Sequence, residues 1–265
     1  MSVSIHPTAL VAKEASLGEN VFVGPFCIVG PQVRLGNDCR LLSHVIIEGN
    51  TTIGSNNTFY QFCSIGSSPQ DNSYKGEDTR VIIGDNNTFR EYVTVHRATT
   101  KEEYKTVIGS NGLFMAYSHI AHDCRIGDKV TLVNSCNLAG HVHIGDRVII
   151  GGSTCISQFV TLGRGAYIGG ASAIDKDIPP FCTALGNRIK LKGINIIGMR
   201  RQNYERNIIS EVVEFYRYME SSAYSPKSFT DNKEMMSVYQ DNPIVGEMAE
   251  FISKSEVGIA PFMNS

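Results

Sequence analysis

An aliphatic or aromatic residue recurs at every sixth position along most of this chain. The pattern runs without interruption from Ile108 to Ile174, and an earlier run from Ile5 to Ile65 has the same spacing. A period of six fits neither a helix, with about 3.6 residues per turn, nor a strand, with a period of about 2. It fits a chain that turns a corner after every sixth residue and stacks three-sided coils, the hexapeptide signature of a parallel β-helix. We therefore predict a mainly β protein in which residues 1–186 form this helix.

Two stretches interrupt the ladder of apolar residues. Residues 67–79 contain Pro and Gly, and residues 97–105 are polar and charged. Inserts in a repeat array tend to project from one face, often the binding face. We expect both loops to reach over a neighbouring chain or a functional site. Helices built from this repeat wind left-handed, against the usual handedness of parallel crossovers.

The six-residue period ends at the two prolines that follow Ile178, because proline cannot extend a sheet. Residues 187–265 have helical spacing instead, and we predict that they form a C-terminal α-helical domain. Expected helix starts are Asn203, a capping box that begins at Asp231, and Asn242, which precedes a proline.

Composition places the chain among ordinary globular proteins. Its 265 residues carry a net charge of −2 with a pI near 6.4, which leaves no strongly basic face for nucleic acid. The seven cysteines form no Cys-x-x-Cys pair, so we interpret them as small core residues in a reducing compartment. Neither a secretory leader nor an apolar run of the ~20 residues that span a membrane is visible, so a cytoplasmic location is expected. Five cysteines occupy the small-residue position of the repeat: Cys27, Cys39, Cys63, Cys124 and Cys136.

The ladder also indicates which polar residues meet. Residues eighteen apart should stack on adjacent coils, which places His122, Gly140 and Gln158 in one column. Asp123 and His141 fall in the column beside it. A lone histidine at such a corner is usually only solvated, and Gly140 alone is explained as a corner glycine. Two histidines on neighbouring coils beside an aspartate indicate a site instead.

His122 suits general-base chemistry. An unperturbed imidazole titrates near ~6.5, and a histidine that removes the proton of an attacking hydroxyl accelerates transfer by about 10² to 10⁴-fold. Asp123 or His141 could orient the ring. The amide of Gly140, one coil away, could stabilise the oxyanion of an attacked thioester.

A basic segment follows the ladder. It contains six Lys and Arg residues and a single acidic residue, Glu205, which gives a local net charge of +5. One interpretation is a solvated linker, and the other is a site for a diphosphate or an acidic carrier protein. The basic residues are Arg188, Lys190, Lys192, Arg200, Arg201 and Arg206.

Several motifs resemble those of one enzyme family, the acyl-carrier-protein-dependent UDP-N-acetylglucosamine O-acyltransferases of lipid A biosynthesis. The resemblance runs nearly from end to end. It implies transfer of a 3-hydroxyacyl chain from the phosphopantetheine of acyl carrier protein to the 3-hydroxyl of UDP-N-acetylglucosamine. It also implies a homotrimer with sites between subunits, and neither a metal nor another cofactor. The most specific motifs are Gln70-Asp71, His119-Ile120-Ala121-His122-Asp123-Cys124 and Leu138-Ala139-Gly140-His141.

The same resemblance implies roles for individual residues. His122 is the general base, Asp123 stands behind it, and the amide of Gly140 holds the thioester oxyanion. Gly170 takes the position that limits acyl length, where a glycine implies room for a long chain. Gln70, Asp71, His119 and His141 are expected to line the sugar and acyl site, and Gln158, Asn195 and Arg201 are expected to hold the nucleotide.

Five positions depart from the family pattern, and one of them is Arg188, where the family often has His or Pro. Ser157 replaces a histidine, and Ser73 replaces a lysine two residues after Asp71. Asp71 therefore keeps its expected role only if another residue replaces that lysine. On the nucleotide side, Ile197 and Gln202 stand where an acidic and a basic residue are common.

Three alternatives stay open at this point. The chain could acylate an amino-substituted UDP-sugar, because nothing in the sequence separates an oxygen acceptor from a nitrogen acceptor. It could be a hydratase of the γ-type carbonic anhydrase kind with His119, His122 and His141 as zinc ligands, although such a site needs neither the Gln-Asp loop nor the basic segment. A solenoid with a purely structural role is the third.

Overall fold

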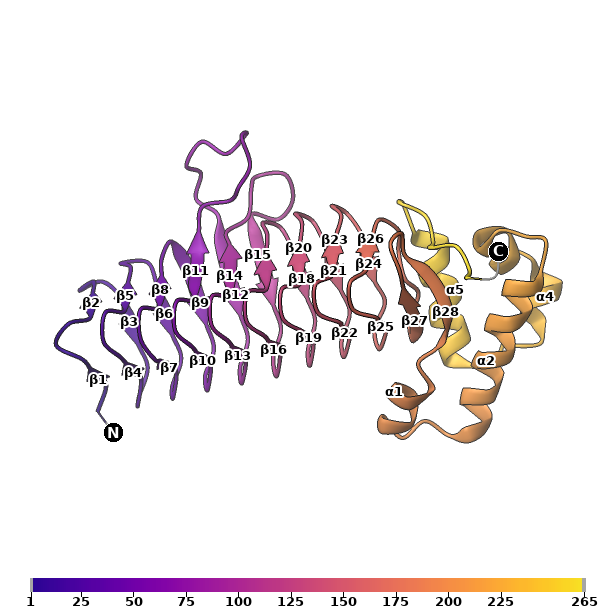
Figure 1. Cartoon of the computed structure of the whole chain (residues 1–265), viewed down its shortest axis with the longest axis horizontal. Coiled ribbons are helices and arrows are strands. Elements are labelled where there is room, and N and C mark those ends of the chain that lie inside the picture. The colour runs from indigo at the N-terminus through magenta and orange to yellow at the C-terminus, as the bar shows by residue number, and fades with distance from the viewer. Residues whose placement is uncertain (1, 264–265) are drawn as a thin grey trace.

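Residues 2–263 form a long three-sided prism with a small helical domain packed at one end, as the computed structural model shows (Figure 1). Within this range twenty-eight strands form three sheets, which we call sheets A, B and C and which are parallel except at the last strand pair. The predicted fold class, a left-handed parallel β-helix with C-terminal helices, is confirmed.

The strands are short, and each coil adds one strand to each sheet in turn. Sheet A contains β1 (Ser4–Ile5), β4 (Phe22–Val23), β7 (Arg40–Leu41), β10 (Thr58–Phe59), β13 (Thr88–Phe89), β16 (Leu113–Phe114), β19 (Thr131–Leu132), β22 (Ile149–Ile150), β25 (Tyr167–Ile168), β27 (Cys182–Leu185) and β28 (Lys190–Ile194). Sheet B contains β2 (Leu10–Val11), β5 (Ile28–Val29), β8 (Ile46–Ile47), β11 (Ser64–Ser67), β14 (Thr94–His96), β17 (His119–Ile120), β20 (Asn137–Leu138), β23 (Cys155–Ile156) and β26 (Ala173–Ile174). Sheet C contains β3 (Ser16–Leu17), β6 (Arg34–Leu35), β9 (Asn50–Ile53), β12 (Arg80–Ile83), β15 (Lys105–Ile108), β18 (Arg125–Ile126), β21 (His143–Ile144) and β24 (Thr161–Leu162).

The residues of the six-residue ladder fill the interior of the prism from Val23 to Ile174, and those of the first coil are partly or fully exposed at its open end. Each strand from β1 to β26 contains one of them, so the predicted ladder is confirmed along its whole length. Inside the prism the rings of Phe59, Phe89 and Phe114 stack with 4.8 and 4.7 Å between successive centroids. Each coil buries its apolar side chains against the next coil, as a solenoid requires.

Tight turns join the sheets at three corners, which we name A–B, B–C and C–A after the sheets that they connect. At most coils one non-glycine corner residue has a left-handed backbone, with φ between 53° and 66°. This conformation is unfavourable for most residues and is tolerated best by Gly, Asn and Asp. The C–A corner fills it mainly with Asn and Asp, whereas five successive coils of the A–B corner fill it with Phe, Tyr or His.

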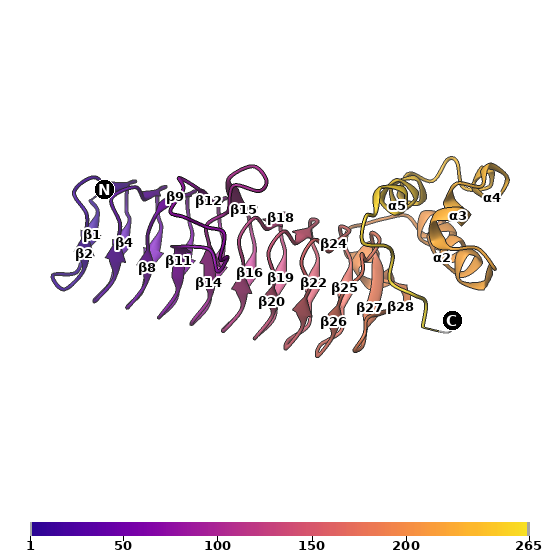
Figure 2. The same cartoon turned by 90° about the horizontal axis from the view of Figure 1, so that it is seen from above.

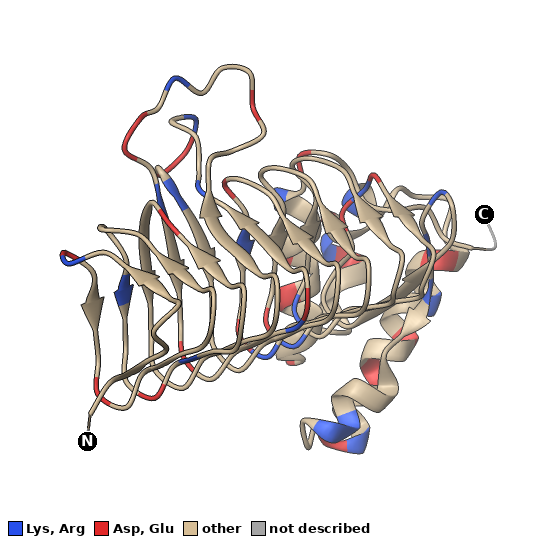
Figure 3. Ribbon diagram, turned by 60° about the vertical axis from the view of Figure 1, so that its left-hand side comes forward, with Lys and Arg blue, Asp and Glu red and all other residues tan. Residues whose placement is uncertain are grey.

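Both interruptions of the ladder leave the prism at the B–C corner. The first loop, residues 68–79, connects β11 to β12, and the second loop, residues 97–104, connects β14 to β15. These strands lie on adjacent coils, and both loops rise above the prism (Figure 1). Figure 3 shows that Lys, Arg, Asp and Glu are interspersed along them.

The helical domain follows β28. Its helices within the described range are α1 (Ile196–Arg201), α2 (Arg206–Ser221), α3 (Pro226–Thr230), α4 (Lys233–Ser237) and α5 (Pro243–Lys254). They pack at the end of the prism (Figure 2). β28 pairs antiparallel with β27, beyond the division that the sequence predicts between residues 186 and 187. None of the helices in residues 2–263 is long and apolar enough to cross a bilayer.

Two of the three predicted helix starts are wrong. α2 begins after Glu205 rather than at Asn203, which has a left-handed backbone in the turn after α1. The cap of α4 is Asn232 rather than Asp231, and its side-chain oxygen accepts hydrogen bonds from two amides of the first turn. Asn242 caps α5 in the same way, as predicted.

The cysteines of the ladder are core residues. All five that occupy the small-residue position are buried, and all seven in the chain are free thiols. Burial raises the pKa of the Cys63 thiol to about 12, so this thiol stays protonated and unreactive at neutral pH.

Candidate active site

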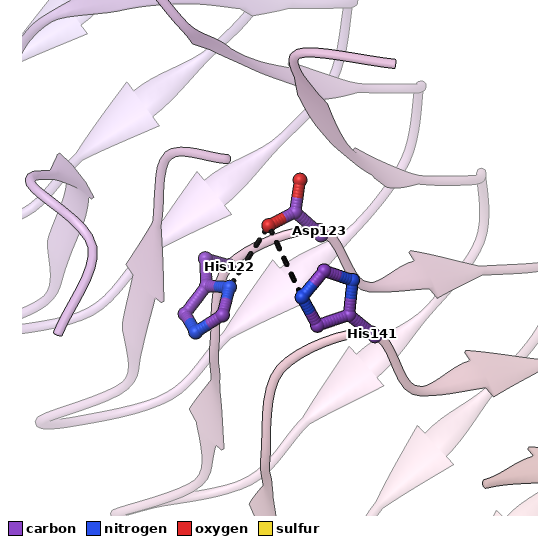
Figure 4. A group of neighbouring side chains, drawn as sticks. All are labelled: His122, Asp123 and His141. Carbon is purple, nitrogen blue, oxygen red and sulfur yellow. Dashed lines mark hydrogen bonds and ion pairs between the residues drawn. The ribbon is translucent and has the colours of Figure 1, made fainter. Parts of the chain in front are cut away.

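The B–C corner brings together the residues that the ladder predicts to stack. His122 and Asp123 follow β17, and Gly140 and His141 follow β20 on the next coil. The amide of His141 donates to the carbonyl of His122 at 3.0 Å, so positions in neighbouring columns do meet. Figure 4 shows the two imidazole rings on either side of the Asp123 carboxylate.

Asp123 is held from several directions. Its Oδ2 lies 2.8 Å from Nδ1 of His122, and it accepts hydrogen bonds from the amide and the hydroxyl of Thr99 at 3.0 and 2.7 Å. Burial tends to raise the pKa of Asp123, but the hydrogen bonds from His122 and Thr99 outweigh burial and leave this pKa below its ordinary value. Asp123 is therefore a carboxylate at neutral pH. It places the proton of a neutral His122 on Nδ1, which leaves Nε2 free to accept a proton.

Gly140 lies directly against the imidazole of His122. A β-carbon at position 140 would sit 2.3 Å from Cε1 and 2.7 Å from Nε2 of that ring. Gly140 is not among the residues with positive φ, so the turn itself does not require glycine here. The close approach of His122 does. No described residue accepts a hydrogen bond from the amide of Gly140, which leaves this N–H available for an oxyanion.

His141 lies between two carboxylates. Its Nδ1 is 2.6 Å from Oε1 of Glu102 in the second loop, and its Nε2 is 3.8 Å from Oδ2 of Asp123. The ring meets His122 edge-on at 5.2 Å between centroids and stacks on Phe159 at 4.6 Å. A cavity of about 390 Å³ opens beside His141 and Glu102 toward α5.

Asp71 in the first loop has a partner from the second loop. Nζ of Lys101 lies 2.6 Å from Oδ2 of Asp71, and the amide and hydroxyl of Ser73 donate to Oδ1 at 2.7 and 2.6 Å. The hydrogen bond from Lys101, followed by those from Ser73, holds the pKa of Asp71 far below its usual range. Lys101 thus replaces the lysine that the family pattern places where Ser73 stands.

His119 and His96 lie next to the corner on sheet B. Nδ1 of His119 is 2.7 Å from the hydroxyl of Thr94, and its ring meets His96 edge-on at 4.8 Å. Burial, with His96 and His122 nearby, lowers the pKa of His119 to about 4, and burial lowers the pKa of His96 as well. Both rings are therefore neutral at physiological pH. Nδ1 of His96 is buried without a hydrogen-bond partner among the described residues.

Three further predicted residues lie apart from this cluster or at its rim. Gln158 is exposed at the B–C corner on the coil beyond Gly140, and Gln70 is exposed in the first loop. Gly170 follows β25 and therefore lies at the A–B corner instead. One chain brings Gln158 to the same corner as His122, but it places Gly170 on another corner.

The two residues predicted to hold the nucleotide from the helical domain are not near His122 in the same chain. Asn195 caps α1, and its side-chain amide donates to the carbonyl of Gly165 at 2.9 Å. Arg201 is exposed in the last turn of α1. Figure 1 shows α1 low at the end of the prism, on the side opposite the two loops.

Sequence reasoning missed several residues that contact this site. Thr99, Lys101 and Glu102 come from the second loop, which has no period from which a contact could be read. The available signal was indirect: a charged insert leaves the ladder at the corner where the histidines stack. The position of His96 beside His119 depends on the coil-to-coil register of β14 and β17.

His122, Asp123 and His141 also form a group of potential metal ligands, whose ligand atoms lie within 4.8 Å of one another. His119 does not belong to this group, and its Nδ1 faces the hydroxyl of Thr94. Within the described part of one chain, the three-histidine set considered for a hydratase is therefore not assembled.

Comparison with known proteins identifies the family. A family model described as UDP N-acetylglucosamine O-acyltransferase, domain 2, matches residues 177–260, and a bacterial transferase hexapeptide model matches residues 14–49. The curated acyl-[acyl-carrier-protein]–UDP-N-acetylglucosamine O-acyltransferase of Thermodesulfovibrio yellowstonii is 45% identical over 257 residues, which cover 96% of this chain and 98% of that protein. The chain belongs to this acyltransferase family.

Solved structures of similar proteins match this acyltransferase from end to end. UDP-N-acetylglucosamine O-acyltransferase from Moraxella catarrhalis has a TM-score of 0.92 at 41% identity, over 97% of this chain and 99% of that chain. UDP-N-acetylglucosamine acyltransferase from Francisella novicida has a TM-score of 0.92 at 36% identity, over 98% of this chain and 95% of that chain. The β-helix and the helical domain therefore both correspond to those of the acyltransferase relatives.

Proposed function

We propose that this acyltransferase transfers a 3-hydroxyacyl chain from acyl carrier protein to the 3-hydroxyl of UDP-N-acetylglucosamine, the first step of lipid A biosynthesis. Similarity to the curated acyltransferase over nearly its whole length supports the reaction and its substrates. One observation carries the mechanism: the imidazole of His122 lies between the fixed carboxylate of Asp123 and the backbone of Gly140.

In this mechanism Nε2 of His122 removes the proton of the 3-hydroxyl as the oxygen attacks the thioester carbonyl. Asp123 stabilises the imidazolium that forms, because its carboxylate faces Nδ1–H. The amide of Gly140 stabilises the oxyanion of the tetrahedral intermediate. The carbon–sulfur bond then breaks, and the imidazolium returns its proton to the departing thiolate of phosphopantetheine. Every step uses side chains and backbone of the protein, so no cofactor or metal is needed.

The residues around the base are proposed to bind the acceptor and the acyl chain. Asp71, fixed by Lys101, the neutral ring of His119 and the ring of His141 offer acceptors and donors to a sugar. Gln70 is proposed to join them from the exposed part of the first loop. Gly170 is proposed to leave room for a long acyl chain.

A homotrimer with sites between subunits is part of the proposal. Asn195 and Arg201 are proposed to hold the nucleotide together with Gln158 of another copy, because α1 lies far from the loops of its own chain (Figure 1). Sheet B offers an apolar surface for this contact. The exposed residues on it and on the adjoining A–B corner include Leu10, Ile28, Ile46, Phe26, Phe62, Tyr92 and Tyr117.

The start of the helical domain is proposed to receive the acyl carrier protein. Arg200, Arg206 and Arg217 line a cavity of about 330 Å³ between α1 and α2. Figure 3 shows Lys and Arg gathered at this end of the helices. α2 has no side-chain cap at its N-terminus, so its dipole adds to the attraction for an acidic partner. The free cysteines suit the reducing cytoplasm, which is the proposed location.

Mass spectrometry of the product tests the reaction. Purified protein, UDP-N-acetylglucosamine and a panel of 3-hydroxyacyl carrier proteins are expected to yield a UDP-sugar that carries one ester-linked acyl chain. The acyl carrier protein that gives the fastest turnover identifies the preferred acyl length. Turnover only with an amino-substituted UDP-sugar, with an amide-linked product, would replace the proposed acceptor.

His122→Ala tests the general base. Turnover is expected to fall by at least about 10²-fold, because a positioned histidine contributes about 10² to 10⁴-fold. Size-exclusion chromatography and circular dichroism should show the same assembly and the same secondary structure as the wild type. Near wild-type turnover in a folded His122→Ala variant would remove His122 from this role.

A further inference from the structure

Four side chains within five consecutive residues of the second loop contact the structure around the B–C corner. Each contact joins a side chain of the loop to a side chain of the first loop, of the corner or of sheet C. The pairs are Thr99 with Asp123, Lys101 with Asp71, Glu102 with His141, and Glu103 with Arg125.

Glu102 determines how the ring of His141 is presented. A carboxylate only accepts hydrogen bonds, so the 2.6 Å contact requires a proton on Nδ1 of His141. Nε2 then points toward Asp123 and the corner. The side chain of His141 is 3% exposed and that of Glu102 is 28% exposed, so water has little access to replace this partner.

Lys101 in turn fixes the orientation of the Asp71 carboxylate in the first loop. Asp71 forms the ion pair between the two loops, with Oδ2 2.6 Å from Nζ of Lys101, and Arg97 adds hydrogen bonds to Ser68 and Tyr74 of the first loop. Ser73 supplies two hydrogen bonds to the other carboxylate oxygen but no charge. Lys101 is therefore the cation that holds this carboxylate in place.

We propose that the second loop is a clamp in which Glu102 and Lys101 are positioning residues for His141 and Asp71. Glu102 sets the tautomer and orientation of His141, and Lys101 sets the direction of the Asp71 carboxylate. The assignment to catalysis rests on the proposed function, whereas the tautomer of His141 does not depend on it.

The loop itself contains the matched control. Glu103 is adjacent to Glu102 and has the same chemistry, but it pairs with Arg125 and Lys105 at 2.8 Å each and contacts neither His141 nor Asp71. Loss of Glu103 therefore reports on the general effect of removing a charge from the loop.

Steady-state kinetics test both positioning residues, Glu102 and Lys101. Glu102→Ala is expected to lower kcat/KM about tenfold, the effect of a lost hydrogen bond to a charged group, and Glu102→Gln, which keeps an acceptor oxygen, should recover part of it. Lys101→Ala is expected to raise the KM for UDP-N-acetylglucosamine about tenfold with kcat within about twofold. Adding Ser73→Lys to Lys101→Ala should restore the KM, because position 73 already reaches the same carboxylate. Glu103→Gln should stay within about twofold of the wild type.

Nitrogen-15 spectra of labelled histidine give a readout that is independent of turnover. The His141 signals, assigned with a His141→Gln variant, should show a protonated Nδ1 in the wild type and in Glu103→Gln, and a shifted Nδ1 signal in Glu102→Ala. A wild type without acyl transfer would defeat the proposed function while the spectra still test the clamp. Wild-type kinetics in Glu102→Ala together with an unchanged Nδ1 signal would overturn the clamp.

Discussion

The C–A and A–B corners of the prism have the same backbone conformation and very different side chains. At the C–A corner, five of the eight non-glycine residues with positive φ are Asn or Asp. At the A–B corner, five successive coils place a ring at this position: Phe26, His44, Phe62, Tyr92 and Tyr117. Since both corners require the same left-handed backbone conformation, the difference between their side chains reflects the surroundings of each corner.

Asn and Asp accept a left-handed backbone because their short polar side chains form local hydrogen bonds, whereas most other residues lose roughly 1–2 kcal/mol. Stacking of the rings at the A–B corner offsets part of this free-energy cost, because successive ring centroids lie 4.8 to 5.0 Å apart. The rings nevertheless stay largely in water, with Phe62 and Tyr117 45% and 59% exposed. A corner that needed only to turn would contain Asn, so the rings indicate a contact surface.

The B–C corner is a third case. It uses the left-handed conformation to direct Asp123, His141 and Phe159, on three successive coils, toward the candidate active site. The same left-handed backbone conformation therefore occurs at a corner that only turns, at a corner that offers a contact surface and at the corner of the candidate active site. Only the side chains distinguish the three corners.

The largest effect is expected from Gly140→Ala at the B–C corner. The added carbon would sit 2.3 Å from the His122 ring, so the imidazole must leave Asp123. Turnover should fall about 10²-fold or more, the contribution of a positioned base. Gly246→Ala in α5 is the matched control, because no atom lies within 4 Å of its β-carbon, and it should keep full activity and gain up to about 1 kcal/mol of stability. Equal rates in the two variants would show that the ring does not need this space.

The next effect concerns the A–B corner. The double substitution Phe62→Asn and Tyr92→Asn removes two stacked rings and relieves two strained backbones. We expect a folded chain of near wild-type stability whose proposed trimer dissociates at least about tenfold more readily, since buried aromatic residues dominate interfaces. Analytical ultracentrifugation over a dilution series measures this. An unchanged dissociation profile would mean that the rings face solvent in the assembly.

A smaller effect is expected from pH through His119 beside the B–C corner. Its pKa is lowered to about 4 in the folded protein by burial, against about 6.5 for a free histidine. The unfolded chain therefore binds the proton first, so the stability that neutral His119 contributes is complete above about pH 6.5 and is lost as the pH falls toward 4. Thermal unfolding should show a steeper decline over this window in the wild type than in His119→Gln. Parallel curves for the two proteins would contradict it.

The smallest effect is expected at the C–A corner. Lys129 has φ of 58° at a position where most other coils hold Asn or Asp. Lys129→Asn should raise the free energy of unfolding by up to about 0.5 kcal/mol, and the reverse change Asn111→Lys on the preceding coil should lower it by a similar amount. Chemical denaturation measures both. Assembly and activity should not change, in contrast to the substitutions at the other corners.

Much of the fold was predictable because the repeat is periodic. Each coil can bury its apolar side chains only against the next, so the six-residue spacing located every strand from β1 to β26 and the column of His122 and Gly140. The reason for Gly140 was not predictable. The turn tolerates other residues there, and only the approach of the His122 ring excludes them.

The loops and the helix caps were harder to predict because they have no period. Asn203 and Asn232 are equally good caps by residue type, yet only Asn232 is used. Similarly, nothing in the order of residues 97–104 says that Lys101 turns to Asp71 while Glu102 turns to His141.

By itself, the amino-acid order determined a three-sided solenoid, the positions of its rungs and the coils that carry the histidines, because a short repeat has one way to bury its apolar side chains. Only the tertiary structure decided which charged side chains hold those histidines and which corner presents rings to solvent. These choices depend on distances between coils and loops that no local spacing encodes.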